Sequence, residues 1–371
     1  MDIVPESSNP KEKQAGALDA IGFTPAWRER FEPYTAQGWE PARVLRSDRG
    51  SALVACEAGV VRAQAAASLL KAARGPIDLP VVGDWAALFK PADLDVPRIE
   101  AVLPRTSAMV RGDPAKGSQV QVLAANMDIV FLVQPIANGP NLRRIERELA
   151  LAWDSGALPV VLLTKADLCA DAEEARAKVE AIAPGVEVLA FDALDPAQVV
   201  AILPHLQERR TAIVIGPSGA GKSTIINTLL GEERQATREV RMSDGRGRHT
   251  TVVRELIALP SGALLIDTPG LRSIVQTGSE EGIAGAFPDI EELAAGCRFR
   301  DCTHQDEPGC AVHAAVDSGL LAAERLASYH KLVREAKAAA RKTDARLRAE
   351  EARKWKIIHK SAKELYKRRG H

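Results

Sequence analysis

A glycine-rich stretch in the second half of the chain constrains the fold more than any other feature. Residues 216–223 read GPSGAGKS, preceded by an apolar run at 211–215 and followed by a helical pattern. This is the G-x-x-x-x-G-K-[ST] phosphate-binding loop in the strand–helix context that it requires. Its glycines let backbone N–H groups converge on an anion at the positive end of the helix. The predicted phosphate-binding residues are Gly216, Pro217, Ser218, Gly219, Ala220, Gly221, Lys222, Ser223 and Thr224.

The chain around this loop alternates between apolar strands and amphipathic helices from about residue 118 onward. Strands are expected at 128–133, 159–163, 186–190, 211–215, 252–259 and 263–267, and helices at 141–156, 172–183 and 196–207. Such alternation predicts a largely parallel α/β sheet whose ligand binds at the carboxyl ends of the strands.

A second phosphate motif, DTPG, ends the strand at 263–267. Asp267 at this position can hold a magnesium-bound water, and the N–H of Gly270 can donate to a γ-phosphate. The Ser223 hydroxyl is expected to bind the same Mg²⁺ directly.

The intervening stretch DGRGRHTT, at 244–251, is rich in Gly and Arg and ends in two hydroxyl residues. A switch loop needs such a threonine, which reaches magnesium only while the γ-phosphate is present. Thr251 is favoured for this role, with Thr250 as the alternative.

The residue that orients the attacking water is less obvious. Many GTPases place a Gln directly after the DTPG-like motif, but here Leu271 follows it and offers no hydrogen bond. His249 in the switch loop is the nearest titratable substitute and is the predicted catalytic residue. We therefore expect slow unaided hydrolysis and an activating partner.

The tetrapeptide TKAD, residues 164–167, follows the apolar run at 159–163. A guanine-reading loop needs a carboxylate that accepts from two base N–H groups, and adenine does not present these donors in that arrangement. Asp167 is predicted to do this, with the Lys165 stem over the ring. The remaining predicted base-binding residues are Thr164, Ala166 and, after the next strand, Ala193.

The order of these motifs is itself informative. An ordinary GTPase has the phosphate loop first and the base-reading loop later, whereas TKAD at 164–167 precedes the loop at 216–223. The strands and helices nevertheless follow the same cycle, cut after DTPG. Because domain termini usually lie at the surface, such a cut can preserve the packing.

The amino-terminal part of the chain differs in character. Residues 41 to about 111 contain short β-prone runs separated by Gly, Pro and Asp, which predict a small antiparallel barrel or sandwich. Residues 1–40 form an extension that the motifs do not explain, partly helical over 21–38.

Three of the five cysteines lie within fourteen residues, in the stretch CRFRDCTHQDEPGC. Cys297, Cys302, His304 and Cys310 offer three thiolates and one imidazole, the closed ligand set of a structural zinc site. A disulfide framework is disfavoured by the odd count. His313 and His330 are expected on helix surfaces rather than as ligands.

Taken together, the chain resembles the circularly permuted GTPases and, among them, the ribosome small-subunit-dependent GTPase A family. The motifs that carry this resemblance are VVGDWAAL, LPRTSAMVR, TKAD, GPSGAGKS, GRGRHTT, DTPGLR and the cysteine cluster. It implies an OB-fold domain at 41–112, a permuted α/β GTPase domain at 113–280, and an α-rich zinc domain with a basic helical tail at 281–371.

The resemblance also implies a function and partners. The expected activity is GTP hydrolysis to GDP late in maturation of the 30S ribosomal subunit, with binding to 16S rRNA, stimulation by the subunit, and catalysis by His249. The expected cofactors are one structural Zn²⁺, and Mg²⁺ with GTP. Thr164 stands at a motif position where Asn is the commonest residue. The chain therefore lacks a side-chain amide that can bridge the base and the phosphate loop.

Charge and hydropathy bear on where the protein acts. Lys+Arg and Asp+Glu balance at 49 each, yet basic residues exceed acidic ones by about ten between 331 and 371. This tail, with Trp355, favours contact with an RNA backbone. No apolar run approaches the ~20 residues of a membrane span, and a cytoplasmic monomer is expected.

Three alternatives stay open. A P-loop ATPase or kinase with a chance TKAD would be separated by competition between GTP and ATP. A nucleotide-gated RNA-binding scaffold with negligible turnover is suggested by Leu271. A permuted GTPase of the large ribosomal subunit is disfavoured by the zinc cluster and the barrel.

Overall fold

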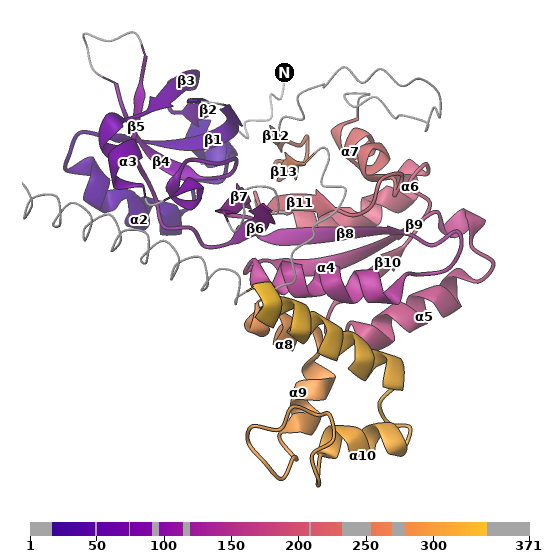
Figure 1. The fold of residues 1–371 in the computed structure, drawn as a ribbon. Coiled ribbons are helices and arrows are strands. Elements are labelled where there is room, and N and C mark those ends of the chain that lie inside the picture. The colour runs from indigo at the N-terminus through magenta and orange to yellow at the C-terminus, as the bar shows by residue number, and fades with distance from the viewer. Residues whose placement is uncertain are drawn as a thin grey trace, which may run out of the picture.

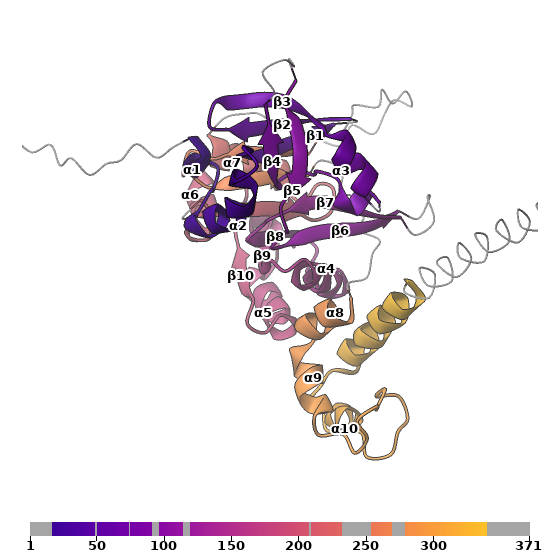
Figure 2. The same ribbon diagram turned by 90° about the vertical axis from the view of Figure 1, so that its left-hand side faces the viewer.

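The computed structural model of the chain describes residues 17–48, 50–73, 75–90, 96–113, 119–207, 209–231, 254–268 and 279–339. They form an amino-terminal barrel, a central sheet covered by helices, and a carboxy-terminal helical module (Figure 1). A view at right angles shows the module extending from the helices below the sheet, on the side away from the barrel (Figure 2). This arrangement confirms the predicted fold class.

The barrel is closed by five strands in the order β1-β2-β3-β5-β4, with β1 also paired to β4. Its strands are β1 (Glu40–Asp48), β2 (Ser51–Cys56), β3 (Gly59–Ala65), β4 (Trp85–Phe89) and β5 (Arg98–Val102), and α3 (Ala67–Ala72) precedes β4. The inner residues are small, mostly Ala and Val, which suits the narrow interior of a barrel of this size. The topology is OB-like.

Two helices precede the barrel, α1 (Ala17–Ala20) and α2 (Pro25–Thr35). Phe31 of α2 and Phe23, which lies between the two helices, belong to an aromatic cluster around Trp85, which is fully buried in β4. The ring centroids of Phe23 and Trp85 are 4.8 Å apart. The described part of the amino-terminal extension therefore packs against the barrel.

The hairpin of β6 (Ala108–Asp113) and β7 (Gln119–Ala125) forms a separate two-stranded sheet after the barrel. The domain boundary expected at residue 112 falls inside this hairpin.

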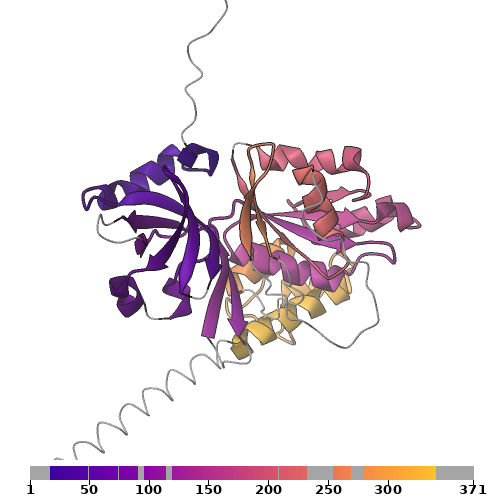
Figure 3. The same ribbon diagram turned by 90° about the horizontal axis from the view of Figure 1, so that it is seen from above.

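Arg43 in β1 joins the barrel to the central sheet. Its guanidinium donates to the Ile21 carbonyl, to the Asn126 carbonyl at 3.3 Å and to the Thr211 hydroxyl at 2.8 Å. The side chain is 2% exposed, and burial lowers its pKa to about 10 despite the opposing charges of Asp128 and Asp84. Viewed from above, the barrel and the sheet lie side by side (Figure 3).

The central sheet has six strands in the order β10-β9-β8-β11-β13-β12, and all neighbouring pairs are parallel except β12 with β13. The strands are β8 (Ile129–Pro135), β9 (Leu158–Thr164), β10 (Glu187–Ala190), β11 (Thr211–Ile215), β12 (Glu255–Ala258) and β13 (Leu264–Asp267). The apolar runs of the inner strands β8, β9, β11 and β13 are buried on both faces, as is usual for central parallel strands, whereas the edge strands β10 and β12 are partly exposed.

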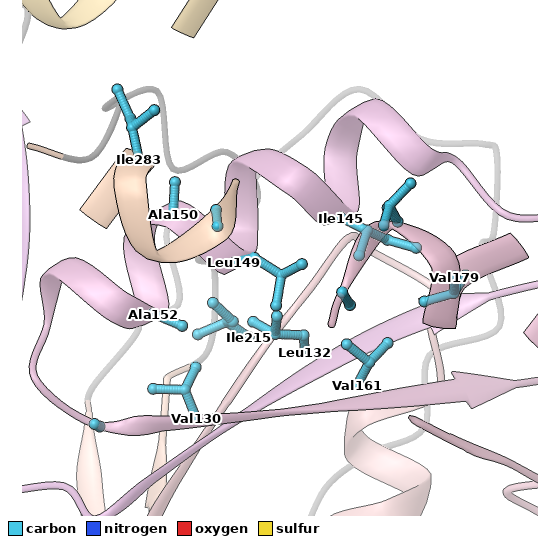
Figure 4. Close-up of a cluster of buried hydrophobic side chains, with 14 of the residues drawn as sticks. Val130, Leu132, Ile145, Leu149, Ala150, Ala152, Val161, Val179, Ile215 and Ile283 are labelled. Carbon is cyan, nitrogen blue, oxygen red and sulfur yellow. The ribbon is translucent and has the colours of Figure 1, made fainter. Parts of the chain in front are cut away.

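Helices cover both faces of the sheet. One face packs against α4 (Leu142–Asp154) and α5 (Ala172–Ile182), and the other against α6 (Pro196–Val199), a 3₁₀ segment (Val200–Leu206) and α7 (Lys222–Leu230). The helix predicted at 196–207 is thus mostly 3₁₀, with Pro204 inside it. Val130 and Leu132 of β8 meet Ile145 and Leu149 of α4 in the first core (Figure 4).

The carboxy-terminal module begins with α8 (Glu280–Ala286), α9 (Pro288–Ala294) and α10 (Ala311–Asp317), and a further helix covers 323–339. Two glycines let α8 approach α4 closely: a Cβ at Gly282 would lie 2.4 Å from the Ala150 carbonyl oxygen, and one at Gly285 would lie 2.9 Å from the Trp153 ring. Among the described helices, none is both long and apolar enough to cross a bilayer.

A buried ionic cluster fastens this module to α4. Arg325 donates to Glu146 at 3.0 Å and to both carboxylate oxygens of Asp289 at 2.9 and 2.7 Å. Ser328 donates to the second oxygen of Glu146. Arg325 and Glu146 are 5% and 3% exposed, so the cluster connects α4, α9 and the helix 323–339 away from water.

Candidate nucleotide and metal sites

The phosphate loop connects β11 to α7 in a backbone conformation that requires glycine. Gly216 has φ 143° and Gly221 φ 89°, and a Cβ at Gly216 would lie 2.1 Å from the Val133 carbonyl oxygen. Glycine is therefore the residue that fits where the loop leaves the sheet. The side chain of Lys222 folds over the loop and donates to the carbonyls of Gly216 at 2.8 Å and Pro217 at 2.6 Å.

The TKAD segment begins at the last residue of β9. Lys165 has a left-handed backbone (φ 59°), and a short 3₁₀ turn over Ala166–Leu168 follows it. This turn leaves Asp167 exposed at the carboxyl edge of the sheet, the edge at which the phosphate loop also begins. The geometry therefore brings the two predicted motifs to one place.

Thr164 joins these two motifs directly. It is fully buried, and its hydroxyl lies 2.7 Å from the Ala220 carbonyl in the phosphate loop and 3.4 Å from the Gln134 carbonyl. TKAD and the phosphate loop are thus connected without the side-chain amide of an Asn, because the shorter Thr164 hydroxyl donates to the phosphate loop. What an amide would add toward the base is not replaced by this contact.

The loop after β10 completes the cluster. The Asp192 carboxylate accepts from the Leu194 N–H at 2.8 Å, and this turn leaves Ala193 5% exposed. A Cβ on Gly221 would lie 3.5 Å from the Ala193 methyl and 3.8 Å from Thr164 side-chain atoms. The phosphate loop, TKAD and the Ala193 loop therefore pack against one another.

The end of β13 lies beside the phosphate-loop strand. Asp267 is half-buried there, and the neighbouring Thr268 hydroxyl donates to the Val214 carbonyl of β11 at 3.1 Å. Asp267 and Ser223 thus belong to adjacent strand–loop units. The predicted residues His249, Thr250, Thr251, Gly270 and Leu271 lie outside the described residues.

One nearby pair was not anticipated from the sequence. Gln134, 2% exposed at the end of β8, donates from its side-chain amide to the carboxylate of Glu148 on α4. Burial raises the pKa of Glu148 to about 7, against the opposing effects of Arg144, the Gln134 hydrogen bond and Lys222. A Glu three residues after the core residue Ile145, on the apolar side of the helix, was the signal that could have revealed it.

The four predicted zinc ligands lie together in the carboxy-terminal module. The sulfurs of Cys297 and Cys310 are 3.9 Å apart, and the His304 Nδ1 lies 3.6 Å from each. All four ligand atoms, including Cys302 Sγ, are within 4.8 Å of one another. A tetrahedral zinc with Zn–S of about 2.3 Å and Zn–N of about 2.1 Å requires S–S and S–N separations of roughly 3.8 and 3.6 Å.

The surroundings of His304 and Cys297 suit a bound metal, whereas burial and the neighbouring thiols raise the pKa of Cys302 to about 11. Burial lowers the pKa of His304, which keeps its ring neutral and able to bind a metal. Burial acts to raise the pKa of Cys297, but backbone N–H donors at Ala311 and Val312 bring that pKa below its usual value, which favours the thiolate. The residues therefore fit one structural zinc ion, as predicted.

Two other histidines lie in this module. His313 and His330 are half-buried rather than exposed on helix surfaces. Neither belongs to the metal-binding group found among the described residues.

Comparison with known proteins agrees with this geometry. The family model described as RsgA GTPase matches residues 102–276. A Streptomyces coelicolor protein named small ribosomal subunit biogenesis GTPase RsgA is 44% identical over 354 residues, covering 94% of this chain and 95% of that protein. A Xanthomonas oryzae pv. oryzae protein of the same name is 50% identical over 267 residues, 72% of each chain.

Solved structures show the same architecture. YloQ, described as a circularly permuted GTPase, has a TM-score of 0.58 and 25% identity, covering 81% of this chain and 95% of that one. YjeQ from Thermotoga maritima has a TM-score of 0.60 and 23% identity, covering 80% and 98%. The chain therefore belongs to the RsgA GTPase family of circularly permuted, GTP-hydrolysing enzymes.

Proposed function

We propose that this enzyme hydrolyses GTP during late maturation of the small ribosomal subunit in the cytoplasm, binds the rRNA of that subunit, and is stimulated by it. The single observation that supports this most is identity of 44% to a small-subunit biogenesis GTPase over nearly the whole of both chains. The barrel, the central sheet and the metal module are all included in that match.

In this proposal the nucleotide binds along the carboxyl edge of the sheet. Asp167 accepts from the guanine base, with Lys165 over the ring, and the N–H of Ala193 donates to the base oxygen. Lys222 exchanges its two loop carbonyls for β- and γ-phosphate oxygens, since a charged phosphate is the stronger acceptor. The full proposed GTP-binding set is Thr164, Lys165, Ala166, Asp167, Ala193, residues 216–224 and Gly270.

Magnesium and water complete the proposed site. Ser223 and Asp267 hold Mg²⁺, directly and through water, and Thr251 joins them while the γ-phosphate is present. His249 orients the attacking water. Slow turnover by the free enzyme follows if this histidine takes position only on the ribosomal subunit.

Each predicted domain has its own role in this proposal. The barrel at 41–112 and the basic tail contact RNA, residues 113–280 carry the nucleotide, and the zinc module at 281–371 docks on the subunit. The protein acts as a monomer.

The decisive experiment measures GTP hydrolysis by the full chain with and without purified 30S subunits. We expect slow turnover alone and a large rise with the subunit, since partners that complete a GTPase site accelerate hydrolysis by about 1,000-fold or more. Lys222→Ala should abolish both rates. Binding to the subunit without any turnover would instead identify a nucleotide-gated scaffold, and equal rates with and without subunits would rule out stimulation.

A further inference from the structure

The side chains of Gln134 and Glu148 extend from the end of β8 and the middle of α4 toward each other, beside the phosphate loop. Gln134 is 2% exposed and holds the Glu148 carboxylate through a hydrogen bond from its amide. The backbone carbonyl of Gln134 lies 3.4 Å from the Thr164 hydroxyl, at the point where TKAD meets the phosphate loop. The pair is therefore built into the wall of the nucleotide site.

The phosphate loop itself lies against the same strand end. A Cβ on Gly216 would be 2.1 Å from the carbonyl oxygen of Val133, the residue before Gln134. Lys222 is held on the carbonyls of Gly216 and Pro217, and its positive charge acts on Glu148 and lowers the pKa of that carboxyl. Glu148 is therefore close enough to sense charge at the place where Lys222 binds phosphates.

We propose that Glu148 determines how strongly the enzyme prefers the triphosphate over the diphosphate. Its ionised carboxylate disfavours the added negative charge of a γ-phosphate, and its neutral form does not. The inference rests on the nucleotide site proposed above and assigns Glu148 as a specificity-determining group of that site.

The charged groups that act on Glu148 are identified among the described residues. Arg144 lies one turn earlier on α4, and Lys222 begins α7. Both favour the carboxylate, whereas burial favours the neutral acid more strongly and brings the pKa to about 7. A γ-phosphate would raise that pKa further, because it adds negative charge and draws Lys222 away.

The sign of the pH dependence follows from this. Below about pH 7 the carboxyl is protonated and the triphosphate meets no repulsion from it. Above that value the carboxylate opposes the γ-phosphate, so the preference for triphosphate falls as pH rises. For unit charges on the order of 10 Å apart at an effective dielectric of roughly 40, the change is about fourfold.

The test uses the full chain at saturating Mg²⁺ and measures Kd for GDP and for a non-hydrolysable GTP analogue between about pH 6 and 8.5. For the wild type, the preference for the analogue should fall about threefold to tenfold across this range. Glu148→Gln should hold the preference at its low-pH value throughout. Glu148→Asp, which keeps a titratable group, should restore a pH dependence with a shifted midpoint.

Two further variants make the outcomes distinct. Glu187→Gln alters an exposed carboxylate at the start of β10, on the opposite edge of the sheet, and should follow the wild type. Lys222→Ala should lose binding of both nucleotides. If it binds them normally, the proposed nucleotide site is wrong; if it does not, but Glu148→Gln keeps the wild-type pH dependence, only the role of Glu148 is wrong.

Discussion

Thr164 connects the TKAD segment to the phosphate loop through one hydroxyl group. Its Oγ1 donates to the Ala220 carbonyl at 2.7 Å in a fully buried position. A side chain shorter than Asn at the end of β9 can do this because the phosphate loop and the Ala193 loop pack tightly around it. Thr164, in place of the more common Asn, therefore keeps a hydrogen bond between TKAD and the phosphate loop.

Replacing that hydroxyl by a methyl group tests the link. Thr164→Val keeps the shape but leaves the Ala220 carbonyl without its partner, which should cost about 1–3 kcal/mol in the free energy of unfolding. GTP and GDP should bind roughly five- to tenfold more weakly, because the phosphate loop is less well held. Denaturant unfolding and nucleotide titration measure the two effects.

Thr164→Ser is the matched control, since it retains the donor and removes only the methyl group. It should bind nucleotide like the wild type. Equal affinities for the Ser and Val variants would show that the hydroxyl does not position the loop.

At the scale of elements, the zinc segment shows why a metal is needed. The stretch from Cys297 to Cys310 contains turns and, among the described residues, no helix or strand of its own. It is followed by α10, whose first turn is capped by Cys310: the His313 N–H lies 3.4 Å from that sulfur. A ligand of the metal thus also starts a helix, so metal binding and helix formation are coupled.

Removing the metal should therefore unfold this module locally. A strong chelator, or Cys302→Ser, should release close to one zinc per chain and abolish amide protection across 297–317. The central sheet should keep its protection, because most residues of its two cores lie outside the segment 297–317. Hydrogen exchange with mass spectrometry checks this, and loss of protection in β8–β11 at the same rate would contradict a separate module.

For the molecule as a whole, two buried arginines fasten the outer parts to the sheet. Arg43 joins the barrel to Thr211 at the start of β11, and Arg325 joins the carboxy-terminal module to Glu146 on α4. The guanidinium of each arginine donates to acceptors that are themselves buried: Asn126 and Thr211 for Arg43, and Glu146 for Arg325. The three parts are held together by polar contacts that cannot be exchanged freely with water.

Removing either arginine should lower the free energy of unfolding substantially. Arg325→Leu leaves Glu146 buried without its cation and should reduce the free energy of unfolding by about 3–5 kcal/mol. Arg147→Ala removes a neighbouring but more exposed pair with Glu335 and should cost less than about 1 kcal/mol. Chemical denaturation of both variants gives the comparison, and similar losses would show that burial of the Arg325 cluster contributes little.

The sequence was sufficient for some of these features and not for others. Motif order and strand–helix alternation predicted the sheet, because both depend on local patterns. The four metal ligands were found because they lie within one short segment. Arg43 and Arg325 could not be found this way: each acts across long separations in the chain, and an Arg within a strand or helix pattern resembles any solvated residue. The helix predicted at 196–207 failed locally, since Pro204 lacks the N–H that an α-helix needs.

The strand order has a consequence for how the protein is made. Strands β8, β9 and β10, with TKAD and the Ala193 loop, are consecutive in the chain and adjacent in the sheet. They leave the ribosome before β11 and its phosphate loop, and chains fold from the amino terminus as they emerge. A nucleotide held by both halves would therefore bridge an early and a late segment across the β8–β11 seam, and its binding would stabilise the newly completed sheet. The cellular supply of nucleotide would then help newly synthesised copies to reach the folded state.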